Sequence, residues 1–177
     1  MSTDDLIENL SKKIRKESVE LYNKSETINQ YLRALVKEAG GKFVTFEESV
    51  SMFYRGFGCS IIDKNNFEIV LRPGNSEFLE NFYIAKALGY FFIFGKVGET
   101  GFFNFYSVGR DFFISNKFAT ALLMPRKELK KSLKKYKNNK KLVANNFQIS
   151  SDFVDNRIDY VKKSSSILYK IRKEKSR

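Results

Sequence analysis

Two polar side chains four residues apart, Lys86 and Tyr90, stand in the middle of an otherwise apolar segment. A spacing of four places them on the same side of a helix. In an H-E-x-x-H segment, the same spacing lets two histidines hold a zinc ion while the glutamate acts as a general base. Ala87 stands here in place of that glutamate. The spacing of a zinc site is therefore present, and its ligands are replaced.

Zinc chemistry needs side chains that this sequence lacks. A catalytic site takes three protein ligands from imidazole, thiolate or carboxylate groups. The chain has no histidine and one cysteine, Cys59, which we expect to be a buried thiol because no histidine can activate it. Lys86 would put a positive charge where the metal ion sits, and Ala87 cannot accept a proton. We expect no cofactor and no zinc-dependent hydrolysis.

Two other kinds of enzyme stay open at this point. A lysine can act as a nucleophile when burial lowers its pKa, but no partner serine pattern accompanies Lys86. A metal-independent enzyme with an unrelated site is a further alternative. No residue of the sequence is singled out for it.

The segment that must position Lys86 and Tyr90 is predicted to be a helix over residues 76–94. Ser76 is a suitable N-cap, two glutamates follow in the first turn, and apolar side chains recur at helical spacing. One face must therefore be buried, and we expect the helix to be central. Its most apolar run, residues 82–94, is shorter than about 18 residues and contains a lysine, which argues against a membrane span.

The elements around this helix predict an α+β fold. Residues 2–38 are predicted to form one or two helices that end at Gly40 and Gly41. A small antiparallel sheet packed on the central helix is predicted from segments rich in β-branched and aromatic residues at 42–46, 58–63 and 67–71. Residues 95–110 suggest a loop with a short strand, and residues 111–124 a helix that ends at Pro125.

The net charge of +12 is confined to one end of the chain. Residues 1–125 contain 15 basic and 15 acidic side chains, whereas residues 126–177 contain 17 basic and 5 acidic ones. We therefore predict a core with N-terminal helices over residues 1–125. Residues 126–177 are predicted to form a basic helical part, packed on that core, with a helix-turn-helix-like segment.

The basic part has two interpretations. Phosphate or acidic-partner contacts are one, made by Lys130, Lys131, Lys134, Lys135, Lys140 and Lys141, with the tail at residues 170–177. The second interpretation is a helical face that is simply exposed to solvent, which is the more common role of a lysine-rich segment. A recognition helix over residues 152–161 would present three aspartates beside Asn156 and Arg157. Because these acidic groups repel phosphates, we expect no sequence-specific reading by that helix.

Three segments of the chain resemble one protein family. Residues 116–125, NKFATALLMP, look like the signature A-N-x-F-A-A-E-L-L-M-P of the ImmA/IrrE-like family. Residues 82–94, FYIAKALGYFFIF, align without a gap with that family's catalytic helix, F-T-L-A-H-E-L-G-H-Y-F-L-H. Residues 142–158 are similar to its motif L-A-x-x-F-x-V-S-x-x-x-V-x-x-R-L. Three motifs in the right order, over roughly residues 40–160, make a stronger case than any one alone.

The resemblance implies a gluzincin-like metallopeptidase scaffold, in which the central helix supplies two histidine ligands and a glutamate base. It also implies a third, carboxylate ligand near the start of the following helix. The sequence departs from this pattern at every catalytic position. The replacements are Lys86 and Tyr90 for the histidines, Ala87 for the base, and Phe112 or Ile114 for the third ligand, with Asp111 the nearby carboxylate.

The function implied is that of a pseudopeptidase. Family members are typically intracellular proteins of bacteria and mobile elements that cleave or control repressors. We expect a cytoplasmic protein, because the acidic N-terminus is no signal peptide. Its partner is expected to be a repressor, nuclease or toxin. The binding surface is expected at the remnant cleft or at an aromatic surface drawn from Phe102, Phe103, Phe105, Tyr106, Phe112 and Phe113, although most of these are expected in the core.

Lys86 itself has two interpretations of equal weight. Its ammonium can replace the metal structurally by pairing with Asp111 or Glu99, with the hydroxyl of Tyr90 completing the network, since a buried charge must be paired. Alternatively, Lys86 extends to solvent and Tyr90 fills the core. The position of the amine decides between them.

Overall fold

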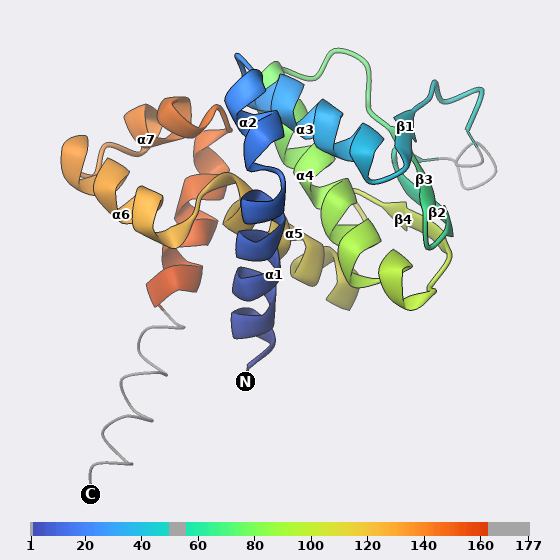
Figure 1. Cartoon of the computed structure of the whole chain (residues 1–177). Helices are drawn as coiled ribbons and strands as arrows, with labels where there is room; N and C mark the ends of the chain where they lie inside the picture. Colours follow the sequence, from blue (N-terminus) through green and yellow to red (C-terminus); the bar gives the residue numbers. More distant parts are fainter. Residues whose placement is uncertain (1, 50–55, 163–177) are drawn as a thin grey trace, which may run out of the picture.

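The computed structural model describes residues 2–49 and 56–162, and Figure 1 shows how their elements are arranged. The helices are α1 Thr3–Glu17, α2 Val19–Lys24, α3 Ile28–Glu38, α4 Glu77–Ile93, the 3-10 helix η2 Gly95–Val97, α5 Arg110–Leu123, α6 Arg126–Lys135 and α7 Lys140–Phe147. The strands are β1 Gly41–Phe43, β2 Gly58–Asp63, β3 Asn66–Val70 and β4 Gly101–Asn104. Residues 151–162 are helical as well and are called helix 151–162 below. The tail at residues 170–177, predicted to contact phosphates, lies outside the described residues.

The N-terminal region forms three helices rather than one or two. Ser2 closes a capping box with Asp5 at the start of α1, which ties down two backbone donors. The side chain of Thr27 accepts a hydrogen bond from Gln30 and starts α3. Because Thr27 is a strong N-cap in the middle of the predicted helical stretch, the chain turns there and α3 packs on α4.

The four-stranded sheet is mixed, with the order β1-β3-β2-β4. Strands β2 and β3 pair in the predicted antiparallel way, and the carboxylate of Asp63 accepts hydrogen bonds from Asn65 and Asn66 in the turn between them. Strand β1 pairs in parallel with β3, so the prediction of an antiparallel sheet is wrong for this strand. The difference lies in the strand order: β1 adjoins β3 and not β2, and it runs parallel to β3 with Gly41 opposite Phe67.

Helix α4 is the central element, as predicted. Ser76 caps it by accepting a hydrogen bond from the backbone of Leu79. It packs against α3, α5 and the sheet, and every residue from Phe82 to Phe91 except Tyr83 is buried. In Figure 1 the sheet lies at one end of the molecule and α6 and α7 at the other, with α1 and α4 between them.

Gly89 lets α4 and α5 approach closely. A Cβ atom at this position would lie 2.9 Å from the ring of Phe118 on α5, closer than side chains pack. Phe118 is fully buried, so its ring has little room to move. The two helices that carry the predicted site residues are therefore held together at a defined distance.

Arg157 anchors helix 151–162 to the rest of the chain. Its side chain is 0% exposed, its Nε donates to the carbonyl of Met124 at 3.1 Å, and its guanidinium pairs with Glu8 of α1. The rings of Phe82 and Phe153 stack with their centroids 3.5 Å apart. These contacts join the C-terminal helix to α1, α4 and the end of α5.

Candidate functional site

Lys86 is buried inside the molecule at the predicted position of a zinc ligand. The side chain is 1% exposed, and its Nζ donates a hydrogen bond of 2.7 Å to the backbone carbonyl of Phe105. The same nitrogen lies 3.6 Å from the centre of the Phe112 ring, which covers it as in a cation–π contact. The amine therefore meets a carbonyl that follows β4 and a ring from α5.

This geometry corrects the prediction of an ion pair. Among residues 2–49 and 56–162, no carboxylate lies within ion-pair distance of the Lys86 amine, so neither Asp111 nor Glu99 neutralises it. The alternative that Lys86 reaches solvent is wrong too, because the side chain is buried. The amine satisfies its hydrogen bonding through a backbone carbonyl.

Burial lowers the pKa of Lys86 from 10.5 to about 7. Removing the amine from water disfavours its charged form. The Phe105 carbonyl and the Phe112 ring act in the opposite direction, since both favour the ammonium. Near neutral pH the amine of Lys86 is therefore close to its titration point, and no carboxylate of residues 2–49 or 56–162 pairs with it.

Tyr90 stands where the sequence comparison predicted the second histidine. Its side chain is buried, and its ring centre lies 4.7 Å from that of Phe103 on β4. Burial raises the pKa of Tyr90 to about 12, and a hydrogen bond with Ser115 of α5 opposes part of that shift. The phenol therefore stays protonated at neutral pH and does not offer a phenolate to a cation.

Ser115 was not predicted as a site residue. It is fully buried, and its Oγ donates to the carbonyl of Phe112, so it holds the first turns of α5 together beside Tyr90. The one sequence signal was its position four residues after Asp111, on the same side of α5. A small hydroxyl residue has too many common structural roles for that signal to be decisive.

A hollow of about 360 Å³ lies between α4, β4 and the start of α5. Tyr90 and Asp111 both line it, together with β4 and the first residues of α5. Lys86 does not line it, because its amine is behind the Phe112 ring. Ala87 is fully buried in α4 and lies away from the hollow as well. The structure thus brings Tyr90 and Asp111 to one opening, whereas Lys86 and Ala87 do not line it.

Cys59 is a further titratable group of the core. It is buried on β2, its Sγ lies 3.8 Å from the carbonyl of Ala87, and burial raises the pKa of its thiol, so the prediction of a buried thiol is confirmed. Within the described parts of the chain, no group of three or more histidine, cysteine, aspartate or glutamate residues is placed to hold a metal ion.

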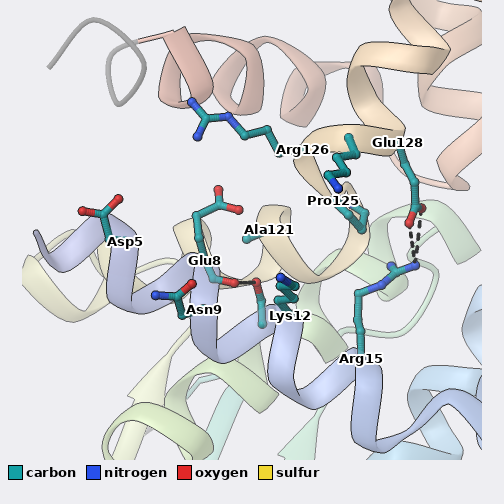
Figure 2. Close-up of a pocket in the computed structure, with 11 residues that line it drawn as sticks. Asp5, Glu8, Asn9, Lys12, Arg15, Ala121, Pro125, Arg126 and Glu128 are labelled. Atoms are coloured by element: carbon teal, nitrogen blue, oxygen red, sulfur yellow. Dashed lines mark hydrogen bonds and ion pairs between the residues drawn. The ribbon is translucent and has the colours of Figure 1, made fainter. Parts of the chain in front are cut away.

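A second hollow, of about 640 Å³, lies between α1 and the start of α6 and is shown in Figure 2. Several of its charged lining residues bond to the surrounding helices. Arg15 pairs with Glu128 and donates to the carbonyl of Leu122, and Arg126 donates to the carbonyl of Val161. We interpret this hollow as a joint between helices, remote from Lys86 and Tyr90.

The predicted phosphate-contacting lysines lie together on the surface of α6 and α7. Every one of them is exposed, and Lys140 pairs with Asp155 of helix 151–162. Arg157 is buried and so is not available to nucleic acid, whereas Asp152 and Asp159 are exposed. The surface of helix 151–162 is thus acidic, as the sequence predicted.

The aromatic residues predicted as a binding surface are divided between core and surface. Phe105 is buried, whereas Tyr106 and Phe113 are 46% and 55% exposed. Phe102, Phe103 and Phe112 are half-buried, and all three line the hollow beside Tyr90. No described helix is long and apolar enough to span a membrane.

Comparison with known proteins gives one match. The model of a peptidase family described as the IrrE N-terminal-like domain matches residues 46–159, which include β2 to β4, α4 to α7 and most of helix 151–162. No curated protein and no solved structure matches the chain.

Proposed function

Because this chain belongs to the IrrE N-terminal-like family of peptidases, we propose that it is a family member without zinc chemistry that acts by binding a protein partner. The observation that carries the proposal is the buried amine of Lys86. It occupies the position of a metal ligand, bonds to the Phe105 carbonyl and is covered by the Phe112 ring.

Each replaced position removes one requirement of zinc-dependent hydrolysis. Near neutral pH part of the Lys86 population is protonated, and an ammonium has no lone pair for a metal and repels a cation. Tyr90 holds a protonated phenol, whose neutral oxygen is a weaker zinc ligand than an imidazole, a thiolate or a carboxylate. Ala87 has no proton acceptor, so a water molecule at this position would have no general base.

The hollow beside Tyr90 is the binding surface we favour. It is bordered by β4, which lies at the edge of the sheet and pairs with β2 on one side. An extended segment of another protein can add to such an edge by backbone hydrogen bonds, while pockets along it select side chains. Asp111 and Arg110 provide charges at the rim, and Phe102 and Phe103 provide apolar area.

The partner class comes from the family resemblance. We propose a repressor, nuclease or toxin encoded beside this chain, on a phage or another mobile element. Charge reversal at the rim of the hollow tests the surface without touching the core, because Asp111 is half-buried at the helix start. Glu20 on α2, whose side chain is 85% exposed, offers a matched control for the same change of charge.

The test is co-purification of the tagged chain with each neighbouring gene product in high salt. We expect one stable complex that D111R weakens at least tenfold and E20R leaves unchanged. If D111R and E20R both bind the partner as tightly as the unchanged chain does, the binding surface lies elsewhere than at the hollow. Zinc-dependent cleavage of the partner would contradict the proposal as a whole.

A further inference from the structure

We propose that α6 and the start of α7 form a surface that binds the phosphate backbone of nucleic acid without reading its sequence. This surface, called the basic face below, consists of Lys127, Lys130, Lys131, Lys134, Lys135, Lys137, Lys140 and Lys141. All eight side chains are exposed. The inference does not depend on the partner proposed above, because the hollow beside Tyr90 is lined by β4 and the start of α5.

The fold sorts the residues of α6 into two sides. Leu129 and Ser132 are buried, Leu133 and Tyr136 are half-buried, and these four positions recur at helical spacing. The lysines take the remaining positions and therefore project together from the opposite side. Asn139 then caps α7, so that its first two residues, both lysines, continue the same cationic segment of the chain.

The clustered positive charges of the basic face lower the stability of α6. Lysines at spacings of three and four repel one another, as do Lys130 and Lys134. Arg126 and Lys127 occupy the first turn of α6, where the helix dipole favours acidic side chains, and Glu128 is the one acidic residue there. Local conflicts of this kind are expected where a surface serves binding rather than stability.

The lysines of the basic face form few ion pairs with carboxylates of the same chain. In the described residues, Lys140 is the one member of the basic face that pairs with a carboxylate, Asp155. By contrast, Lys13 on α1 and Lys24 on α2 each pair with a glutamate one turn away on their own helix. A merely solubilising face is expected to mix both signs as α1 and α2 do, whereas the basic face leaves its charges for an external anion.

The side chains themselves indicate the kind of anion. Lysine is a mobile point charge that suits phosphate oxygens, whereas reading guanine edges relies chiefly on the rigid fork of arginine. The basic face contains no arginine among its eight members. The exposed aspartates of helix 151–162, Asp152 and Asp159, also oppose its entry into a groove. We therefore expect the basic face to contact the phosphate backbone of nucleic acid and not the base edges.

The test is binding of the full chain to two short DNA duplexes of unrelated sequence, measured by fluorescence anisotropy at several salt concentrations. Five phosphate contacts predict a log–log slope of about −4.5, and about a 500-fold loss of affinity between 50 and 200 mM salt. Both duplexes should bind equally. A clear preference for one sequence, or an affinity that does not change with salt, would overturn the proposal.

A charge-reversal variant identifies the surface. K130E/K134E removes two contacts, so we expect at least about a 50-fold loss at 0.1 M salt and a slope that is less steep by about 2. The matched control K16E/K37E makes the same change of net charge on exposed sites of α1 and α3 and should bind like the unchanged chain. Equal losses in both variants would indicate attraction by net charge and contradict a defined surface.

Two competitors distinguish nucleic acid from other polyanions. Poly-glutamate and vesicles of anionic lipid are compared with unlabelled DNA at equal charge concentration. The proposal expects DNA to compete best, and K130R/K134R to retain binding because its positive charge is kept. Equal competition by poly-glutamate would assign the basic face to acidic proteins, and stronger competition by vesicles would assign it to a membrane surface. Either result would refute the proposal.

Discussion

Replacing Lys86 by methionine removes the buried amine while keeping a long, flexible side chain in the same space. Burial lowers the pKa of Lys86 from 10.5 to about 7, and one pKa unit corresponds to about 1.4 kcal/mol. The full cost of holding the ammonium in the core is therefore about 5 kcal/mol. Methionine loses the hydrogen bond to Phe105, which costs about 1–3 kcal/mol. We expect K86M to be more stable at pH 7 by about 2 kcal/mol.

The pH dependence gives a sharper result than the stability at one pH. Because the folded-state pKa of Lys86 lies below its unfolded value, the unfolded chain binds the extra proton between about pH 7 and 10.5. The stability of the unchanged chain relative to K86M must therefore rise with pH in that window. Between pH 7 and 8.5 the difference is about 1.5 kcal/mol. Ionisation of the Cys59 thiol in the unfolded state cancels from this difference, because both chains contain that residue.

Urea unfolding at constant ionic strength measures this difference. The stability advantage of K86M over the unchanged chain should shrink as the pH rises from 7 to 8.5, while m stays the same. K37M changes an exposed lysine and should show no such trend. Parallel pH curves for K86M and the unchanged chain would refute the reasoning, because they would mean that Lys86 has the same pKa in both states.

Two further predictions concern packing. R157M should lower the free energy of unfolding by about 3 kcal/mol, because it leaves Glu8 without its partner. The control K162M changes an exposed site of the same helix and should alter that free energy little. Urea unfolding measures both variants. G89A should be destabilised by about 1 kcal/mol in the same assay, since the added methyl group overlaps the Phe118 ring by more than its higher helix propensity recovers. Unchanged stability in R157M or a gain in G89A would contradict these contacts.

Local signals in the sequence were sufficient for the central helix and its neighbours. Ser76 and the apolar spacing predicted α4, and Pro125 marked the end of α5. The segments rich in β-branched and aromatic residues at 58–63 and 67–71 predicted β2 and β3. The parallel pairing of β1 was not predictable in the same way, because it joins residues that are far apart in the sequence, such as Gly41 and Phe67.

The sequence was sufficient to place the residues of the candidate site on a helix, but it did not show which groups their side chains contact. The spacing placed Lys86 and Tyr90 correctly on one helix, but the partner of the amine is the backbone carbonyl of Phe105, and any residue type supplies such a group. The pairing of Arg157 with Glu8 joins residues that are 149 positions apart, and no local pattern reports it. The first contact depends on how α4 packs beside the segment after β4, and the second on how α1 meets helix 151–162.

The central claim is that this peptidase-like chain carries no zinc where its relatives' ligands would stand. Metal analysis of the purified protein, after incubation with zinc and removal of the excess, tests it most directly. We predict no stoichiometric zinc and no change in the urea midpoint on adding the metal, because Lys86 and Tyr90 offer a buried amine and a protonated phenol. One zinc ion per chain, lost in Y90F, would contradict the account.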